Sequence, residues 1–455
     1  MGYISLFFSF IFFLYSVYDN KKKIIMPKTL FYLLWTFILL LSNLNLYNIT
    51  RPSNFAYYLI LTMLIFFLIG DLITKLNTHN INSFLIENKF IKNINKFIIK
   101  IRTLFSKKPK FYLIYILSIL FIFFTLIDCY VVIKNLMSGV PMYEIRHWRM
   151  GSFGIDLNPM LNRRTFVEEI FRSVILVPFE TLLPPIAAYC FFNKNEKKKH
   201  KYFILILSLI VLILSSIAGG GGRLGFIYYF GSFLLMFLVL LNKKSINYKK
   251  HFKFIILILF FGFICTILLT KIRTTNSFIK QVYTYFALPP TLLSLWLPEI
   301  VNTPHTYGLL SLFGMHSYVF RGLDAIGLNN LVPNIYYNVF QHVLNAENFL
   351  DVGYGTGNAF VTPIYYFMID GGIPFVCIAS LFLGFILSKV YNNIIKKMDI
   401  RNFVIYVLIM YGIFLTFIRI QTVIPAYIIS FIFAFFLLDK YDKKEKKVVK
   451  KNEKK

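Results

Sequence analysis

Arginine is the residue type whose distribution in this chain points to chemistry. The chain has 49 lysines and arginines, and 36 of them lie in six segments between apolar stretches, where all but two are lysine. A guanidinium offers a planar fork of donors that matches a phosphate, whereas an ammonium is a point charge. Of the 13 basic residues outside these segments, ten are arginine: Arg51, Arg146, Arg149, Arg163, Arg164, Arg172, Arg223, Arg273, Arg321 and Arg419. This preference for arginine predicts phosphate-binding sites, although the arginines could also be ordinary loop residues.

Four of the arginines predict a site for a lipid-linked diphosphate, because they lie at the ends of apolar spans or in the long segment 271–372. Arginines at membrane depth would hold and neutralise a diphosphate leaving group as a sugar bond breaks. A histidine or a carboxylate would take the proton of the incoming hydroxyl. The predicted diphosphate-binding residues are Arg223, Arg273, Arg321 and Arg419, and the predicted catalytic residues are His305 and Asp370. Asp370 stands before two glycines, a pattern that is also typical of a turn.

A run of four glycines, Gly219 to Gly222, closes one apolar span directly before Arg223. Such a run ends a helix and lets a ligand approach exposed backbone amides, and Arg223 then stands at the amino terminus of the next span. The pattern predicts an anion site, or alternatively a flexible helix break with an arginine reaching the interface.

Aromatic and basic residues alternate in Arg146-His147-Trp148-Arg149. A tryptophan stacks on sugar faces and an arginine binds phosphate. We therefore predict Arg146 and Trp148 as glycan-binding residues, with an interfacial membrane anchor as the equal alternative.

Composition places these residues in a membrane protein. Hydrophobic residues make up 57% of the 455 residues and charged residues 15%, too apolar a balance for a soluble domain. Eleven stretches are long enough for a spanning helix, centred near residues 11, 38, 64, 122, 183, 210, 232, 262, 381, 410 and 431. None shows the short alternation of an outer-membrane barrel. We predict an all-α polytopic membrane protein with about 11 transmembrane helices.

The net charge of +29 could indicate nucleic acid as a partner, but the lysines lie beside spans, where they act as topology signals. Placing them in the cytoplasm predicts an external amino terminus, a cytoplasmic carboxyl terminus and no nucleic-acid partner. Segment 271–372 is then a large external loop that holds the active site. Pro289-Pro290 predicts that residues 278–297 form a broken, interfacial or re-entrant helix pair in this loop, lining a cavity.

The remaining organisation is a single integral membrane domain, 1–455. Apolar residues at helical spacing with interleaved lysines predict a cytoplasmic amphipathic segment at 74–110, lying on membrane lipid. Residues 135–173 form an external loop, in which 161–171 is expected to be a short interfacial helix, and 440–455 form a basic cytoplasmic tail. The four cysteines lie inside spans without metal-ligand spacing, so we predict no metal and no cofactor.

Three passages together resemble a known family: Gly219 to Arg223, Pro304 to Gly308, and Asn358 to Thr362 continued by Tyr365, Tyr366 and Asp370-Gly371-Gly372. The family is that of the oligosaccharide repeat-unit polymerases, the Wzy-type O-antigen polymerases. The resemblance implies a metal-independent glycosyltransferase of the bacterial cytoplasmic (inner) membrane, which joins undecaprenyl-diphosphate-linked oligosaccharides, as donor and acceptor, into surface polysaccharide. It also implies Tyr307, Asn358, Tyr365 and Tyr366 as glycan-binding residues, and a chain-length regulator is an expected further partner. An acidic residue often follows the family's span-ten arginine, but this chain has Arg419-Ile420-Gln421.

Two alternatives remain. O-antigen ligases share the architecture, but their His-Asn pair is replaced here by Gly357-Asn358. A lipid-linked oligosaccharide flippase or exporter would line its path with charges inside the spans, where the sequence indicates almost none, and would not need a hundred-residue outer loop.

Overall fold

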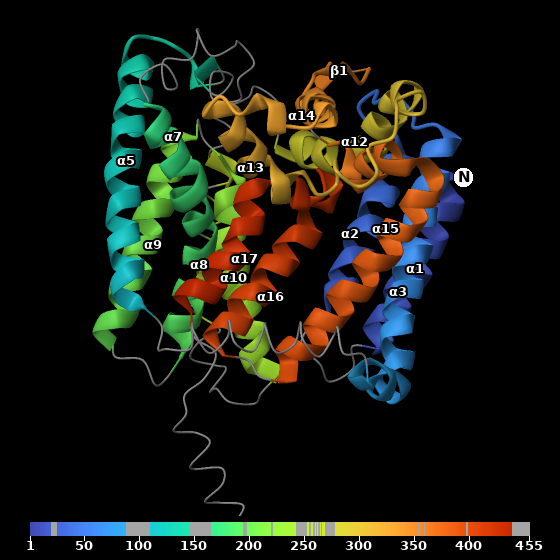
Figure 1. Cartoon of the computed structure of the whole chain (residues 1–455), viewed down its shortest axis with the longest axis horizontal. Helices are drawn as coiled ribbons and strands as arrows, with labels where there is room; N and C mark the ends of the chain where they lie inside the picture. The colour runs from blue at the N-terminus through green and yellow to red at the C-terminus, as the bar shows by residue number, and fades with distance from the viewer. Residues whose placement is uncertain are drawn as a thin grey trace, which may run out of the picture. The chain divides into compact units, whose positions relative to one another are not determined.

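The computed structural model describes residues 1–19, 25–87, 110–142, 144–145, 165–193, 198–219, 222–242, 278–353, 355–358, 360–396 and 399–438, with isolated positions between 253 and 268. These residues are almost wholly helical (Figure 1). The described strands, β1 (Leu350–Asp351) and β2 (Thr356–Gly357), pair as one short antiparallel hairpin.

Nine helices in the described ranges are long and apolar enough to cross a membrane, which confirms the predicted all-α polytopic membrane fold. A further apolar helix, α17 (Pro425–Leu437), is shorter, and the stretch predicted near residue 262 has only isolated described positions. The nine spans lie in α1 (Gly2–Asp19), α2 (Pro27–Leu44), α3 (Asn54–Glu87), α5 (Phe111–Met137), the run α7 (Phe166–Phe171), η2 (Arg172–Leu176) and α8 (Val177–Phe192), α9 (Lys198–Ala218), α10 (Leu224–Asn242), α15 (Thr362–Lys396), and α16 (Ile400–Phe414) with η4 (Leu415–Phe417).

Several predicted segments are only partly covered. Helix α3 continues to Glu87, so it includes the start of the predicted amphipathic segment, whose residues 88–109 lie outside the described ones. The tail 440–455 and most of loop 135–173 also lie outside them. The helix expected at 161–171 is described from Phe166, and there it runs directly into the span that ends at Phe192 instead of standing apart.

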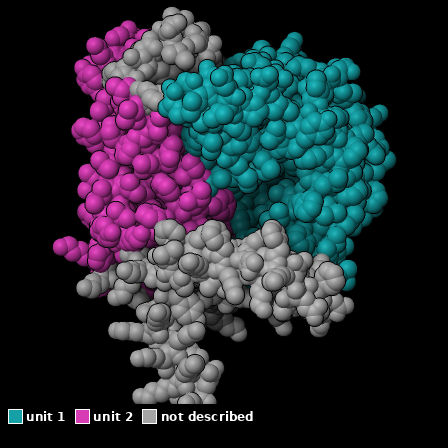
Figure 2. All heavy atoms as spheres, in the orientation of Figure 1, with its two compact units in different colours: residues 1–85, 276–395, 408–428 teal, residues 86–275, 396–407, 429–455 magenta. Residues whose placement is uncertain are grey.

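Two compact units divide the chain that the sequence predicts as a single domain (Figure 2). Unit 1 comprises residues 1–85, 276–395 and 408–428, and unit 2 comprises residues 86–275, 396–407 and 429–455. The long segment 278–372 belongs entirely to unit 1, where it forms α12 (Phe278–Ile300), α13 (Phe313–Ala325), η3 (Asn329–Leu331), α14 (Asn334–Asn345) and the β-hairpin.

One end of unit 1 gathers the elements of segment 278–361 around the connection between α2 and α3, and we call it the loop end (Figure 1). Three contacts fix α12 to this connection. The Thr291 hydroxyl donates to the Thr50 carbonyl at 2.9 Å, the Ser53 amide donates to Ser294 Oγ at 2.9 Å, and the Leu46 amide donates to Tyr283 Oη at 2.7 Å. The loop end is therefore tied by hydrogen bonds to the ends of two spans.

Helix α12 is a correction to the sequence prediction, because it runs unbroken from Phe278 to Ile300 through Pro289 and Pro290. A proline removes one helical hydrogen bond and bends the helix. Here packing compensates, since Leu288 and Leu292 are buried in one apolar cluster with Ile49 and Val352. The prediction that this stretch is not a span agrees with its absence from the nine described spans.

Helix α15 breaks where the sequence has Gly371-Gly372. Gly372 has φ +67° and ψ −157°, a conformation that side chains disfavour, and the helix axis changes direction there. The arm beyond the break packs very closely on α3, because a side chain at Gly70 would collide with the backbone of Leu381 and one at Gly384 with the backbone of Phe67. The arm before the break, 362–370, belongs to the loop end.

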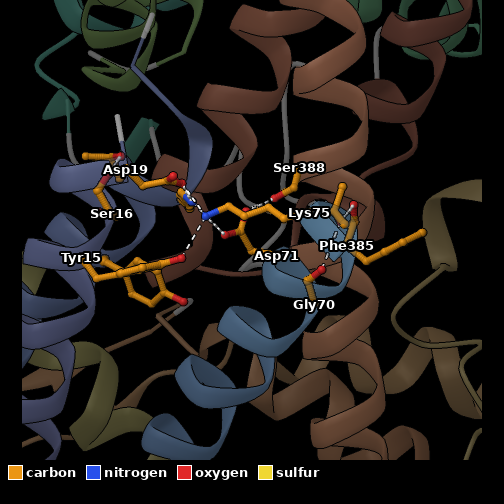
Figure 3. A network of polar contacts seen from close by, with 12 residues as sticks. Tyr15, Ser16, Asp19, Gly70, Asp71, Lys75, Phe385 and Ser388 are labelled. Carbon is orange, nitrogen blue, oxygen red and sulfur yellow. Dashed lines mark hydrogen bonds and ion pairs between the residues drawn. The ribbon is translucent and has the colours of Figure 1, made fainter. Parts of the chain in front are cut away.

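The opposite end of unit 1, the network end, holds four charged residues from three spans (Figure 3). Lys28 Nζ is paired with Asp19 and, at 2.8 Å, with Asp71, and it is 2% exposed. Lys75 Nζ lies 2.7 Å from Asp19 and 3.7 Å from Asp71. Ser388 of α15 donates to Asp71 at 2.6 Å.

Unit 2 buries a second charged group inside its spans. Arg172 Nη1 lies 2.7 Å from Asp128, and its Nη2 lies 2.7 Å from Glu168. The expectation that almost no charge lies within the spans is therefore wrong. These charges are nevertheless mutually paired, as low-dielectric surroundings require.

Candidate functional site

Asp370 is the residue on which the loop end is organised. It is fully buried at the end of the first arm of α15. Its Oδ1 accepts from the Thr306 hydroxyl at 2.6 Å and from the amides of Gly308 and Leu310 at 3.0 Å each. Its Oδ2 accepts from the Ser311 amide at 2.9 Å and from the Ser311 hydroxyl. With five donors on two oxygens, this carboxylate has the environment of a structural anchor and not of a proton acceptor.

The anchored loop carries His305 and Tyr307 on its surface. Two backbone bonds continue the attachment, from Thr306 to the Ile369 carbonyl at 3.1 Å and from Tyr307 to the Asp370 carbonyl at 2.9 Å. His305 is exposed, and its ring lies against Gly372, where an added Cβ would be 3.7 Å from Cε1. Of the two predicted catalytic residues, His305 is therefore the one that a substrate can reach.

Arg419 belongs to a mostly buried polar cluster at the same end. Its guanidinium is 16% exposed and pairs with Glu347, which follows α14. The Tyr366 hydroxyl is fully buried without a hydrogen-bond partner in the described part of the chain, and it interacts electrostatically with Arg419 and Glu347. Arg419 and Glu347 lie far apart in the sequence and are brought together by the fold.

Asn358 joins this cluster to the β-hairpin. Its amide Nδ2 donates to the Glu347 carbonyl at 2.9 Å. Next to it the Thr362 amide donates to the Ile418 carbonyl at 3.1 Å, with Thr362 at φ +65°, which is rare for a β-branched residue. The ring of Phe360 stacks on Phe417 with centroids 5.8 Å apart. These contacts hold the segment before α15 against the residues around Arg419.

An open cleft of about 170 Å³ adjoins the cluster through Asn358 and Phe360. One wall comes from the first turns of α12 and the other from β2 and the residues that follow it. Tyr285 and Phe360, which both line the cleft, are in edge-to-face contact with centroids 5.2 Å apart. The lining residues are Lys280, Gln281, Thr284, Tyr285, Leu288, Thr356, Gly357, Asn358 and Phe360.

Tyr365 and Tyr366, predicted to bind glycan, are both fully buried. The Tyr365 hydroxyl donates to the His342 carbonyl at 3.2 Å, and its ring packs edge-on against Trp296. Burial lowers the pKa of His342, partly offset by the attraction of Glu299, so this histidine is neutral at pH 7. Tyr365 and Tyr366 thus support the site from the protein interior. Tyr307 is instead 80% exposed and can contact a ligand.

The other predicted arginines are not brought to this cluster by any contact that the structure describes. Arg321 lies on α13 with its guanidinium 4.7 Å from the centroid of Phe340 and 5.9 Å from that of Phe313. Arg223 precedes α10 in unit 2. Arg273, Arg146 and Trp148 lie outside the described residues.

Sequence reasoning missed Glu347 and Lys280. Glu347 carries no local signal, because it stands in an ordinary polar turn after α14 and meets Arg419 only in the fold. Lys280 lies seven residues after Arg273 and could have been noticed as one of three lysines outside the six basic segments. Within the described residues, no group of three or more His, Cys, Asp or Glu side chains could hold a metal ion.

No protein-family model, curated protein or solved structure matches this chain.

Proposed function

We propose that this protein is a metal-independent glycosyltransferase that polymerises undecaprenyl-diphosphate-linked oligosaccharide repeat units into surface polysaccharide on the outer side of the bacterial cytoplasmic membrane. One observation supports the proposal. Arg419 follows a span and is held in a mostly buried ion pair with Glu347, whose backbone carbonyl accepts a hydrogen bond from Asn358, a residue that lines an open polar cleft.

Arg419 suits the donor diphosphate. Its fork is preorganised by Glu347, and the incoming diphosphate would replace that carboxylate as the partner of the guanidinium. Arg419 then neutralises the charge that develops on the leaving diphosphate. Its guanidinium is already largely removed from water, and electrostatic interactions are stronger in such surroundings than in water. Arg223 and Arg273 stay predictions from the sequence as diphosphate-binding residues.

His305 suits the acceptor. A hydroxyl of the acceptor sugar attacks the anomeric carbon of the donor, the carbon–oxygen bond to the diphosphate breaks, and the hydroxyl proton passes to the imidazole. The diphosphate leaves as an anion with the lipid. Two observations support this role: His305 is exposed and rests on Gly372, and Asp370 holds the loop that carries it.

A lipid-linked oligosaccharide transporter is the second candidate, favoured by the charges buried in the spans. Those charges are paired with one another at Lys28 and Arg172, which suits structural roles. Deletion of the gene separates the two candidates. Loss of the polymerase should leave single repeat units on the cell surface, whereas loss of a transporter should remove surface glycan altogether and trap lipid-linked units inside.

Complementation then tests the site. Arg419→Lys keeps the charge but not the fork, and losing one bond to an ionised partner slows transfer by roughly tenfold to a hundredfold. We expect its glycan ladder to shorten towards single units. Arg51→Lys, a matched change at an exposed arginine of the same end, should restore the full ladder. A normal ladder with Arg419→Lys would remove Arg419 from the diphosphate site, and an unchanged ladder after gene deletion would refute the polymerase itself.

A further inference from the structure

The Tyr366 hydroxyl is a buried donor beside Arg419. Tyr366 lies on the first arm of α15 and is fully buried, and among the described residues its hydroxyl has no hydrogen-bond partner. A buried hydroxyl in this state costs free energy, because the water that it loses on folding is not replaced. Such groups are rare in native proteins and call for an explanation. Two ionised neighbours with which it interacts electrostatically, Arg419 and Glu347, suggest one.

The backbone fixes the tyrosine and the arginine next to each other. The Thr362 amide donates to the Ile418 carbonyl at 3.1 Å. Tyr366 stands one helical turn after Thr362, and Arg419 directly follows Ile418 between η4 and η5 (Gln421–Val423). Both side chains are therefore carried by helical segments that one backbone contact holds together, and their proximity does not depend on a long loop.

A carboxylate satisfies the arginine but not the tyrosine. Glu347 pairs with the Arg419 guanidinium, yet within the described ranges the Tyr366 hydroxyl donates to neither oxygen of that carboxylate. A carboxylate presents two oxygens in one plane, whereas each phosphate of a diphosphate presents several oxygens in tetrahedral directions. A phosphate can therefore accept from a forked guanidinium and from a neighbouring hydroxyl at once.

Glu347 is the partner that can leave this ion pair. Its side chain is 34% exposed, compared with 16% for Arg419, and it stands in the turn that follows α14. Its backbone carbonyl is held by Asn358 at 2.9 Å, so only the side chain has to turn away. Water can solvate the carboxylate once it has turned out, whereas the more deeply buried guanidinium would be left without a counter-charge unless another anion replaced Glu347.

We propose that Tyr366 is a diphosphate-binding residue, whose hydroxyl donates to a phosphate oxygen of the lipid-linked donor when that diphosphate displaces Glu347 from Arg419. The proposal rests on the proposed polymerase function and adds to it a second ligand of the leaving group and an internal competitor for the same site. Tyr366 keeps its proton throughout and stabilises the negative charge that the diphosphate acquires as it leaves. This role replaces the glycan-binding role that the family resemblance implies for Tyr366.

Binding of inorganic pyrophosphate tests the proposal without requiring polymerisation. The full chain in lipid nanodiscs is titrated with pyrophosphate by calorimetry, and its thermal unfolding is recorded without ligand. We expect Tyr366→Phe to weaken pyrophosphate binding roughly tenfold to a hundredfold, the effect of one lost hydrogen bond to an ionised partner. Its unfolding temperature should not fall, because the variant loses no hydrogen bond described for the unliganded chain. Glu347→Gln should tighten the binding roughly tenfold, because a neutral amide competes less well than a carboxylate for the guanidinium.

The matched control is Tyr283→Phe, at a buried tyrosine of the loop end whose hydroxyl donates to the Leu41 carbonyl at 2.8 Å and accepts from the Leu46 amide. This variant should show the opposite pattern, with a lower unfolding temperature and unchanged pyrophosphate binding. Tight binding by Tyr366→Phe would overturn the role of Tyr366. A loss of binding together with a lower unfolding temperature would also overturn it, because the hydroxyl would then have a structural partner.

Two further outcomes would contradict the displacement of Glu347. Weaker pyrophosphate binding by Glu347→Gln would mean that the carboxylate organises the site instead of competing for it. Absence of binding by both the natural chain and Glu347→Gln would mean that Arg419 and Tyr366 form no diphosphate site. The glycan ladder of the deletion strain reports separately on polymerisation. An unchanged ladder combined with the expected pyrophosphate results would therefore refute the polymerase and retain the diphosphate site.

Discussion

At the scale of single residues, the described hydrogen bonds of the Asp370 side chain all go to the loop that follows His305. Its two oxygens are occupied by five donors from residues 306–311. A sixth bond to a substrate proton would have to displace one of them. Because hydrogen bonds to charged groups contribute about 1.5 to 3 kcal/mol each, the carboxylate stabilises the loop strongly. His305 therefore depends on Asp370 for its position.

Replacing Asp370 and His305 separates anchoring from catalysis. Asp370→Asn turns an acceptor oxygen into a donor that faces the Ser311 amide, so we expect the free energy of unfolding to fall by about 3 kcal/mol and the glycan ladder to collapse. His305→Gln at an exposed position should change stability by about 0.5 kcal/mol or less and still collapse the ladder. Thermal unfolding in detergent and the ladder in complemented cells measure the two effects. An Asp370→Asn protein of normal stability that makes no polymer would instead make Asp370 a catalytic group.

Residue types and local spacing could indicate Asp370, Asn358 and Arg419 as important but could not assign their partners. The donors to Asp370 lie about sixty positions earlier in the chain, and Glu347 reaches Arg419 across a comparable separation. These pairs form only when α12, α14 and α15 pack together, and a local pattern of residues does not indicate them. For the same reason, the sequence does not indicate that Tyr365 and Tyr366 are buried.

At the scale of elements, the network end explains how the long arm of α15 is fixed. Lys28 stands at the amino terminus of α2, where the helix dipole disfavours a positive charge. Two carboxylates, the buried Asp71 and the partly exposed Asp19, compensate for both the dipole and the lost hydration. Ser388 and the Phe385 carbonyl then connect α15 to Asp71 and Thr74 of α3. These contacts fix the arm of α15 that follows the break at Gly372, whereas the arm before the break, residues 362–370, carries the candidate site.

Removing one charge of this network should destabilise unit 1. Lys28→Met keeps a side chain of similar length but removes its charge. Lys75 is then the one cation paired with both Asp19 and Asp71, so one negative charge is left uncompensated. Breaking a buried pair in this way costs about 3 to 5 kcal/mol. The matched control, Lys389→Met, removes an exposed lysine of the same end and should cost about 0.5 kcal/mol or less. Denaturation midpoints of the solubilised proteins decide the matter, and equal midpoints for the two variants would show that the network contributes little.

Apolar length predicted the spans well, since a helix must satisfy its own backbone in lipid. Local helix breakers were predicted less well. Gly371-Gly372 does interrupt α15, because Gly372 adopts a conformation that needs glycine, but Pro289-Pro290 does not interrupt α12. The difference is tertiary, because the prolines sit in a helix packed tightly on α2 and the connection after it.

At the scale of the whole molecule, unit 1 has two ends joined by its spans. Helix α2 begins at the network end and finishes at the loop end, a path of about 27 Å for its 18 residues. Helices α1 and α3 run the opposite way, and the connections 45–53 and 278–361 therefore share one end. This alternation agrees with the side assigned to these segments from the lysine distribution, but the absolute orientation stays a prediction.

Labelling by an impermeant thiol reagent decides that orientation. With the four native cysteines replaced by alanine, a cysteine is placed at Asn330, exposed in η3 at the loop end, or at Asn393, exposed near the far end of α15. We expect Asn330→Cys to react in intact cells and Asn393→Cys to react only after the membrane is permeabilised, which also shows that the second site is reactive. The reverse pattern would place the cleft, His305 and Arg419 in the cytoplasm. The proposed reaction would then be excluded there, because its lipid-linked substrates are joined on the outer side.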